Sequence, residues 1–460
     1  MANLQEPRQI AGFASTPGRW KRYPAYKPSG VDWLGPIPTH WEVKHLKYAA
    51  KLNPDVLAEE TDPDSVLSYV DITNVDSRGV IISPQDLRFE DAPSRARRKV
   101  QHGDTVLSTV RTYLKAIAYV EHPPDNLIVS TGFAVLRPGP EWHARFLYRL
   151  VQSHEFVETV VAHSEGVGYP AINPGGLASL GVWLPPSSEQ QAIAAFLDRE
   201  TAKIDALVAK KERLLELLEE KRTALITHTV TNGLNRSAPM KDSGVEWLGG
   251  IPAGWEIKRL KYLTPDRRPI MYGIVLPGPN VDDGVPIVKG GDVAPGHLRL
   301  DLLNRTTREI EAGYARSRLR SGDIVYAIRG SIGSAELVPA ELDGANLTQD
   351  AARVAPRSGT EGRWLLFALK SQATFAQLDA GAMGAAVRGV NIRDLKRAII
   401  AVPRGEEQPE VAAFLNRETA EIDALIAKVR EHMERLREYR GAVISAAVTG
   451  RIDVRGEVAS

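Results

Sequence analysis

The sequence predicts an α+β protein: two pseudo-repeated mixed α/β domains separated by two long helices that form an intramolecular antiparallel coiled coil. One observation is a phrase written twice, SGVDWLGPIPTHWEVKHLKY from residue 29 and SGVEWLGGIPAGWEIKRLKY from residue 243, with 14 of 20 positions identical. A second is AAFLDRETAKIDALVAK from residue 194, which returns from residue 412 as AAFLNRETAEIDALIAK with 14 of 17 positions identical. A third is that this second phrase opens a long run of strong helix formers in both copies. A frame repeated in this order indicates two copies of one fold.

Bulk composition limits the class of protein. A chain of 460 residues, 43% of them hydrophobic, is expected to form two or more globular domains. No apolar run reaches the roughly 18 residues of a membrane span, and the N-terminus lacks the apolar core of a signal peptide, so we expect a cytoplasmic protein without membrane contact. The absence of cysteine excludes disulfides, thiol nucleophiles and cysteine-based zinc sites. Because the net charge is only +1, a nucleic-acid surface must be a local patch.

The order of the repeats predicts five segments. They are an N-terminal arm (1–26), a first variable domain (27–186), a central helical region (187–235), a second variable domain (236–403), and a C-terminal helical region with its tail (404–460).

The two variable domains show mixed α/β patterns with a bias toward strands. The first carries short runs of β-branched residues in VLSYV, DTVLSTVR and NLIVSTGFAVLRP, followed by an expected helix in EWHARFLYRLVQSHEFVETVVAH. The second carries GDIVYAIRG and AARVAP, then an expected helix in GRWLLFALKSQATFAQL. The two blocks barely match each other, although HGDTVLSTVR parallels SGDIVYAIR.

Two long helices are expected at about Glu189–Thr229 and Glu407–Val448. Their apolar residues follow an alternating four-three spacing, which is a heptad seam that needs a partner helix. The seam residues are Ile204, Val208, Leu215, Leu218 and Leu225 in the first helix, and Ile422, Ile426, Val429, Met433, Leu436, Val443 and Ala447 in the second. Arg222 and Arg440 interrupt the seam at equivalent positions, where we expect their side chains to snorkel toward solvent.

Motifs for catalysis are missing from the sequence. It has no G-x-x-x-x-G-K-[ST] phosphate loop, no G-x-G-x-x-G after a strand, and no histidine pair at metal-binding spacing. Neither of its two Pro-Pro pairs follows the Asn or Asp of a base-methylating motif. We therefore expect no catalytic and no metal-binding residues, and a binding or scaffolding role.

The repeated phrases resemble the conserved regions of type I restriction–modification specificity subunits. SGVEWLGGIPAGWEIKRLKY, with its partner at residue 29, resembles the opening of each half of these subunits, and the block from GVWLPPSSEQQ to THTVTNGL is similar to their central region. The core of that region is present as Pro185, Pro186, Glu189 and Gln190. The second copy keeps Pro403, Glu407 and Gln408, with arginine in place of one proline.

The resemblance implies a non-catalytic DNA-binding subunit. In this family each variable domain is a target-recognition domain for one half of a bipartite asymmetric site on double-stranded DNA, and the helices bind two methyltransferase subunits. Restriction subunits, which combine motor and nuclease, join them. The chain itself is expected to bind no cofactor, while S-adenosylmethionine, ATP and Mg belong to the partner subunits. The alternatives are the specificity module of a related methyltransferase/nuclease system, or a coiled-coil scaffold that contacts no DNA sequence.

Candidate DNA-binding residues lie in loops after the matched strands, where family resemblance places the DNA face. Arginine can pair with guanine, and asparagine with adenine, while lysine and small polar groups hold phosphates. The candidates are Arg111, Thr112, Tyr113, Lys115, Tyr169 and Asn173 in the first domain, and Lys289, Arg329, Ser331, Arg388 and Asn391 in the second. The alternative for Arg111 and Arg329 is an ion pair at a strand end, and for Tyr113 a place in the core. The glycine-rich loops around Tyr169 and Arg388 could also simply form turns.

The paired tryptophans recur in the frame rather than in the variable domains. We therefore expect Trp33, Trp41, Trp247 and Trp255 to pack within the protein and not to stack on bases.

Overall fold

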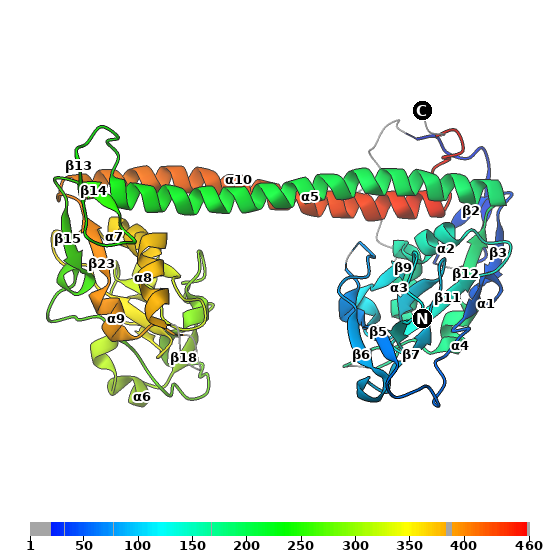
Figure 1. Ribbon diagram of the computed structural model, residues 1–460, viewed down its shortest axis with the longest axis horizontal. Helices are drawn as coiled ribbons and strands as arrows, with labels where there is room; N and C mark the ends of the chain where they lie inside the picture. The colour runs from blue at the N-terminus through cyan, green and yellow to red at the C-terminus, as the bar shows by residue number, and fades with distance from the viewer. Residues whose placement is uncertain (1–19, 32, 77, 167, 383–388, 458–460) are drawn as a thin grey trace, which may run out of the picture. The chain divides into compact units, whose positions relative to one another are not determined.

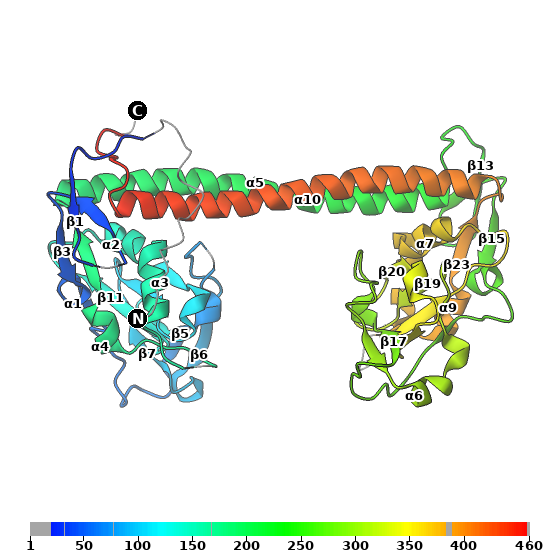
Figure 2. The same cartoon turned by 180° about the vertical axis from the view of Figure 1, so that it is seen from behind.

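The computed structural model describes residues 20–457 except 32, 77, 167 and 383–388, and it folds into two compact units (Figures 1 and 2). Unit 1 combines Met1–Lys211 with Arg430–Ser460, and unit 2 is Glu212–Val429. Unit 1 is therefore built from both ends of the sequence.

Unit 1 contains two four-stranded sheets and two strand pairs. The sheets have the strand orders β6-β5-β10-β7 and β4-β11-β8-β9, and the pairs are β1 with β2 and β3 with β12. The strands are β1 (Tyr26–Pro28), β2 (Pro36–Pro38), β3 (Glu42–His45), β4 (Ala50–Leu52), β5 (Val66–Val70), β6 (Gln85–Arg88), β7 (Ala96–Lys99), β8 (Thr105–Ser108), β9 (Ile117–Tyr119), β10 (Leu127–Ser130), β11 (Phe133–Pro138) and β12 (Gly181–Leu184). The short helices are α1 (Leu46–Ala49), α2 (Ala144–Val151), α3 (His154–Ala162) and α4 (Pro174–Ser179).

Unit 2 has a three-stranded sheet, a four-stranded sheet and two strand pairs. The sheets have the orders β18-β17-β21 and β16-β22-β19-β20, and the pairs are β13 with β14 and β15 with β23. The strands are β13 (Met240–Asp242), β14 (Gly250–Pro252), β15 (Glu256–Arg259), β16 (Met271–Tyr272), β17 (Val285–Val288), β18 (Asn304–Thr306), β19 (Ile324–Ala327), β20 (Ala335–Leu337), β21 (Asn346–Leu347), β22 (Ala351–Val354) and β23 (Ile399–Val402). The short helices are α6 (Arg308–Ala312), α7 (Gly362–Lys370), α8 (Gln372–Ala382) and α9 (Ile392–Arg397).

The two units repeat one topology. In unit 1 the order β4-β11-β8-β9 is antiparallel throughout, and β16-β22-β19-β20 repeats it in unit 2. The parallel pair of β5 and β10 returns as the parallel pair of β17 and β21. Since the variable blocks share little sequence, this match confirms the expectation of two copies of one fold, and with it the predicted fold class.

The short matched motif HGD/SGD has a structural role in both units. Asp104 is fully buried and accepts two hydrogen bonds of 2.9 Å from the Arg137 guanidinium. Asp323 is 2% exposed and accepts from Arg268 at 2.8 and 2.6 Å. A carboxylate this deep in the fold requires such a partner, because an unpaired buried charge is strongly unfavourable. The motif therefore holds the start of β8 and β19.

The repeated opening phrase is explained by its contact with the starts of the two long helices. The Trp41 indole donates to the Glu189 carboxylate at 2.8 Å, and the Trp255 indole donates to Glu407 at 2.6 Å. Trp41 is fully buried and Trp255 is 2% exposed, as expected for packing residues. Trp33 packs on Trp183 with 5.8 Å between ring centroids, whereas Trp247 is 41% exposed and departs from the expectation.

The glutamine after each of these glutamates ties the helix start to its unit. Gln190 accepts from the His143 amide (2.7 Å) and donates to the Glu141 and Pro185 carbonyls (3.0 Å each). Gln408 accepts from the Glu361 amide at 2.9 Å. Both glutamines are buried, so the Glu-Gln core of the repeated motif fixes how each long helix enters its unit.

The long helices are α5 (Ser187–Asn232) and α10 (Glu407–Val448), which run side by side in Figures 1 and 2. In unit 1 Arg440 donates to Asp205 at 2.9 and 3.3 Å, and in unit 2 Arg222 donates to Asp423 at 2.8 and 3.2 Å. From 205 to 222 the pairing advances 17 residues along α5 and goes back 17 along α10, from 440 to 423. The helices are therefore antiparallel, as predicted.

The predicted seam is only partly buried. Eight of its residues are at most 8% exposed, namely Ile204, Val208, Ile422, Ile426, Val429, Met433, Val443 and Ala447. Leu215, Leu218, Leu225 and Leu436 are half-buried. The expectation that Arg222 and Arg440 snorkel toward solvent is wrong, because each forms a two-bond ion pair with the aspartate of the opposite helix.

Two expected helices are each broken in the middle. The segment after β11 forms α2 and α3, because the Ser153 hydroxyl accepts a hydrogen bond from the Phe156 amide and starts a new helix. The segment in unit 2 forms α7 and α8, and the Ser371 hydroxyl accepts from the Thr374 amide at the same point. Serine at a helix start competes with helix continuation, which periodicity alone does not detect.

In the part of the chain that the structure describes, no helix is both long and apolar enough to cross a membrane.

Candidate nucleic-acid interface

Three strands of unit 1 end at one edge of its sheets. β5 and β10 are parallel, so their carboxyl ends lie together, and β8 ends beside the start of β11, which follows β10 closely. The Thr109 amide donates to the Gly132 carbonyl, and the Thr131 amide donates to the Arg95 carbonyl, both at 2.8 Å. The loops after these strands, around residues 71, 109–115 and 131–132, and the turn before β7 around residue 95 therefore form one surface, which we call loop edge 1.

Arg111 lies at the centre of this edge, against the second predicted loop. Its guanidinium carbon is 4.5 Å from the centroid of the Tyr169 ring, a cation–π geometry. Its amide donates to the Pro170 carbonyl at 2.8 Å, and Val110 forms a β-bridge with Ala171. Tyr169 is 63% exposed. The structure thus brings together the two loops that the sequence analysis selected separately.

The other residues of the Arg111 loop divide into exposed and structural ones. Tyr113 is 51% exposed, so it does not belong to the core. The Lys115 ammonium lies 3.2 Å from the Glu158 carboxylate. Thr112 is 3% exposed, and its hydroxyl is hydrogen-bonded to the Ser164 hydroxyl at 3.0 Å. The Thr112 side chain therefore faces the protein interior, where its bond to Ser164 holds the loop in place.

Asn173 and Asn391 occupy equivalent positions with equivalent local roles. The Asn173 side chain accepts from the Gly176 amide (2.7 Å) at the start of α4, and Asn391 accepts from the Arg393 amide (2.8 Å) at the start of α9. Each asparagine is therefore an N-cap, a role for which asparagine is a preferred residue. The sequence alone does not distinguish an asparagine that caps a helix from one that contacts a base.

Unit 2 forms the corresponding surface from the ends of β17, β19 and β21, which we call loop edge 2. Arg329 forms a β-bridge with Gly389, and the Val390 amide donates to the Ile328 carbonyl at 2.8 Å, as the two loops pair in unit 1. The Arg329 guanidinium lies 3.8 Å from the Asp350 carboxylate and its side chain is 49% exposed. No aromatic side chain takes the place of Tyr169 among the described contacts of Arg329.

Lys289 lies on loop edge 2, where the glycine that follows it allows the backbone to pass close to the Arg329 loop. A Cβ atom at Gly290 would lie 2.6 Å from the Arg329 carbonyl oxygen and 3.0 Å from that of Asp350. Only glycine permits this approach without moving a backbone, so Gly290 keeps Lys289 beside Arg329. The Lys289 amide donates to the Asp292 carboxylate at 2.8 Å.

Two further candidates complete unit 2. Ser331 is exposed in the turn after Arg329, and its carbonyl accepts from the Ser334 amide at 3.0 Å. Arg388 lies outside the described residues.

Loop edge 1 also contains a group that the sequence analysis missed. The Arg95 guanidinium donates to the Tyr69 hydroxyl (2.9 Å) and to the Asp71 carboxylate (2.5 Å). Both contacts raise the pKa of Arg95 further, with the Tyr69 hydrogen bond the larger cause. The sequence signal that could have indicated this group is the position of Asp71 directly after a strand, which is also the position of Lys289 in unit 2.

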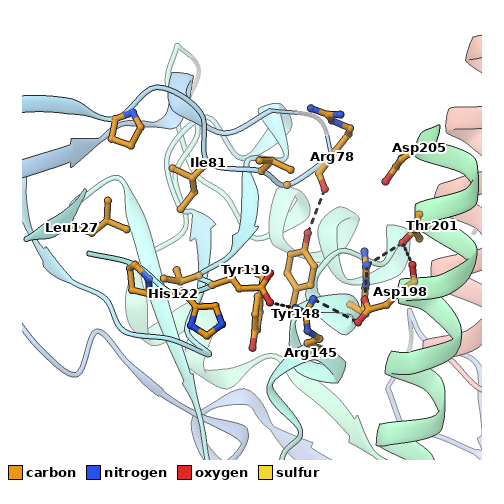
Figure 3. Close-up of a pocket in the computed structure, with 18 of the residues that line it drawn as sticks. Arg78, Ile81, Tyr119, His122, Leu127, Arg145, Tyr148, Asp198, Thr201 and Asp205 are labelled. Atoms are coloured by element: carbon orange, nitrogen blue, oxygen red, sulfur yellow. Dashed lines mark hydrogen bonds and ion pairs between the residues drawn. The ribbon is translucent and has the colours of Figure 1, made fainter. Parts of the chain in front are cut away.

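A cleft of about 750 Å³ lies elsewhere in unit 1, between the turn at Arg78, the end of β9 and α5 (Figure 3). Figure 3 shows the Tyr148 hydroxyl directed to the Arg78 carbonyl, a distance of 3.4 Å, and Arg145 lying beside Asp198. Arg149 donates to Asp198 at 2.8 Å, which links α2 to α5. Three of its arginines, Arg145, Arg149 and Arg440, form ion pairs with acidic residues of the same cleft, so we interpret the cleft as a structural contact between α2, α5 and α10. Within the described residues, no group of three His, Asp or Glu side chains could hold a metal ion.

Comparison with protein families finds a match over part of the chain. Residues 80–217 match the family described as "Type I restriction modification DNA specificity domain". These residues include loop edge 1 except the part around residue 71, and they include α5 as far as residue 217.

Individual relatives carry the same description. The chain is 26% identical over 317 residues to the type I restriction enzyme EcoBI specificity subunit of Escherichia coli, covering 68% of this chain and 66% of that one. It is 22% identical over 352 residues to the EcoKI specificity subunit of E. coli K12, covering 72% and 70%. The chain thus spans about two thirds of the length of these relatives.

A solved structure confirms the fold over nearly the whole chain. It comes from work on complex assembly and conformational transition of the type I R-M system, and it matches with a TM-score of 0.68 and 23% identity, covering 90% of this chain and 99% of that one. The protein is therefore of the class that combines a duplicated α/β domain with two long helices. Its resemblance to the specificity subunits of type I restriction–modification systems is confirmed in sequence and in fold.

Proposed function

We propose that this chain is the DNA sequence-specificity subunit of a type I restriction–modification complex, in which loop edge 1 and loop edge 2 each contact one half of a bipartite, asymmetric site on double-stranded DNA. The observation that carries the proposal is one fold with two different loop edges. Arg111 is paired with an aromatic ring in unit 1, whereas Arg329 lies beside a carboxylate in unit 2. Because base edges are distinguished by donor and acceptor patterns, two different loop edges are suited to two different half-sites.

The repeated frame supports the proposed partners. The Trp-to-Glu and Arg-to-Asp contacts occur once in each unit, so the frame offers two equivalent surfaces to two equivalent proteins. We propose that these are two methyltransferase subunits and that restriction subunits join the assembly. The chemistry and its S-adenosylmethionine, ATP and Mg then belong to the partners, and this chain has no catalytic step.

Purification of the chain with and without a methyltransferase subunit tests this proposal. The expected result is sequence-selective, salt-sensitive DNA binding that strengthens with the partner, and adenine methylation at one bipartite sequence in a cell that expresses both chains. Methyl transfer by this chain alone would instead indicate an enzyme. Formation of a complex that binds all sequences equally would indicate a coiled-coil scaffold.

A further inference from the structure

Arg95 is an exposed arginine whose orientation is fixed by the protein. It lies in the turn before β7, and its side chain is 57% exposed. Its Nε atom donates to the hydroxyl of Tyr69, which is 3% exposed, and one Nη2 hydrogen points to Asp71. Asp71 is itself fixed, because its other oxygen accepts from the Ile72 amide at 2.5 Å.

The two contacts occupy one edge of the planar guanidinium group. Its Nη1 atom forms no hydrogen bond among the described residues. The N–H groups of Nη1 and the second N–H of Nη2, which form the outer edge, can therefore donate to another molecule. A surface arginine normally loses side-chain entropy when it binds a ligand, and a side chain already held by two acceptors loses less. Arg95 is thus preorganised as a donor pair directed away from the protein.

The position of Arg95 corresponds to a second cation in unit 2. Asp71 follows β5 and its amide donates to the Asn74 side chain at 2.9 Å, while Lys289 follows β17 and its amide donates to Asp292 at 2.8 Å. At this point of the fold unit 2 has Lys289 itself. Unit 1 has Asp71, which binds Arg95 from the turn before β7. Both loop edges therefore present a cation here.

We propose that Arg95 is a base-contacting residue of unit 1, whose two outer nitrogens donate to the O6 and N7 atoms of a guanine in the major groove, with Tyr69 and Asp71 as positioning residues. This inference rests on the proposed function. The Arg95 guanidinium is held in one direction by two fixed acceptors. Two parallel hydrogen bonds to a base edge require a fixed direction, whereas one bond to a phosphate oxygen does not, so this geometry suits a base edge better.

The chain supplies a matched control. Arg88 is 51% exposed and lies in the same sheet, but it is opposite Val66 at the start of β5, at the end away from loop edge 1. Its partners are the carboxylates of Asp64, Glu90 and Asp91. Arg88 is therefore an ordinary surface ion pair, with no expected contact to DNA.

The test compares Arg95→Gln, Arg95→Lys, Tyr69→Phe and Arg88→Gln in the complete chain, each with the methyltransferase subunit, by mapping methylated adenines and by measuring binding to single-base variants of the wild-type site. Arg95→Gln and Arg95→Lys should lose about tenfold or more of the discrimination at one G·C pair in one half-site. Tyr69→Phe should show a smaller loss at the same pair, and Arg88→Gln should match the wild type. Arg95→Lys keeps the positive charge but lacks the paired donors of the guanidinium group. If Arg95→Gln does not fold, the base preference of Arg95→Lys alone tests the inference.

Other results overturn the inference in distinguishable ways. If the wild-type complex methylates no defined sequence, the proposed function itself fails. If the wild type is specific and the Arg95 variants keep the same base preferences, only the inference fails. An equal loss of affinity for all sequences, with a weaker dependence on salt, would identify Arg95 as a phosphate contact and also contradict it.

Discussion

Arg111 adopts a left-handed backbone conformation with φ of 52°, and Lys115 at the other end of the same turn has φ of 53°. For residues other than glycine this conformation costs on the order of 1–2 kcal/mol. The strain fixes a turn that presents Tyr113 and Leu114, each about half exposed, beside the Arg111–Tyr169 pair. Strained backbone of this kind is typical of functional loops.

From this geometry we predict that Arg111→Gln relaxes the base preference in one half-site only. The loss should be about tenfold or more at one base pair, because a paired arginine–guanine contact is replaced by a weaker one. Competition binding with DNA variants in each half-site measures it. Arg329→Gln is the matched variant in unit 2 and should affect the other half-site. An equal loss in both half-sites after Arg111→Gln would contradict the assignment.

Glu311 in unit 2 leads to a prediction about pH. It is 1% exposed and accepts hydrogen bonds from Arg318 (2.6 Å) and Asn346 (2.9 Å). The Arg318 contact, and then the Asn346 contact, hold the pKa of this carboxyl below its usual value of 4.5. A group with a lowered pKa contributes stability that is fully present above the unfolded pKa and is lost as pH falls through the folded one. Glu311→Gln should therefore remove part of the decrease in stability below about pH 4.5.

Urea unfolding of the wild type and Glu311→Gln between pH 7 and pH 3 measures this effect. Glu341→Gln is the control, because Glu341 is exposed and its carboxylate accepts one long hydrogen bond, of 3.4 Å, from the Leu300 amide. An unchanged dependence on pH in Glu311→Gln would show that this carboxyl is not responsible.

At the scale of single residues, the sequence predicted which loops form the surface but not the role of each side chain. Arg111 and Arg329 were selected by residue type, position after a strand and family resemblance, and Tyr169 by its place in a glycine-rich loop. Thr112 faces the interior, and Arg95 reaches loop edge 1 from a segment with no matching motif. Those facts depend on backbone angles in turns and on contacts between distant segments, neither of which leaves a periodic pattern in the sequence.

At the scale of elements, α5 and α10 were the best predicted. Their seam comes from a spacing that belongs to the helix itself, so periodicity detects it. The ion pairs across the seam were not predicted, because the partner of Arg440 is 235 residues away. The breaks between α2 and α3 and between α7 and α8 were missed for a local reason, the hydroxyl caps of Ser153 and Ser371.

The two ion pairs differ in burial, and this difference predicts different energies. In unit 1 the Arg440 side chain is 13% exposed and that of Asp205 is 26%, whereas Arg222 and Asp423 in unit 2 are 26% and 52% exposed. Asp205→Arg should lower the free energy of unfolding by about 2 kcal/mol, because it places two cations together in a partly buried site. The double variant with Arg440→Asp should recover most of that loss.

The corresponding reversal of Asp423 and Arg222 is the matched control, and it should cost about 1 kcal/mol or less, because exposed pairs contribute little. Hydrogen exchange resolved by peptide separates the effects on unit 1 and unit 2. A double variant at 205 and 440 that is as unstable as the single one would show that packing at these positions, not charge, determines the register.

At the scale of the whole molecule, the duplication of the fold was predictable and the composition of the units was not. Two repeated phrases in a fixed order are visible in the sequence, and they correspond to the Trp41–Glu189 and Trp255–Glu407 contacts. The topology shared by the variable blocks could not be derived, since strand pairing such as β5 with β10 joins segments with little resemblance to β17 and β21. That unit 1 uses both ends of the chain follows only from the antiparallel pairing of α5 and α10.

This composition predicts which part of the protein depends on the C-terminal segment. Seven residues of that segment are buried with the core of unit 1, namely Val443, Ile444, Ala446, Ala447, Val448, Ile452 and Val454. Burial of one valine or isoleucine side chain contributes about 1.5–3 kcal/mol, so four of them reach the 5–15 kcal/mol that holds a typical domain together. The Tyr26 hydroxyl also donates to the Gly450 carbonyl at 2.9 Å.

Removal of residues 430–460 should therefore unfold the remainder of unit 1, although most of that unit lies more than 200 positions earlier in the sequence. Hydrogen exchange should become fast throughout the described part of residues 20–211 while the core strands β19 and β22 of unit 2 stay protected, because unit 2 contains none of the deleted residues. Removal of only residues 456–460, of which the described Gly456 and Glu457 are exposed, is the control and should leave both units protected. If unit 1 keeps its protection without residues 430–460, the C-terminal part of α10 is not part of its core.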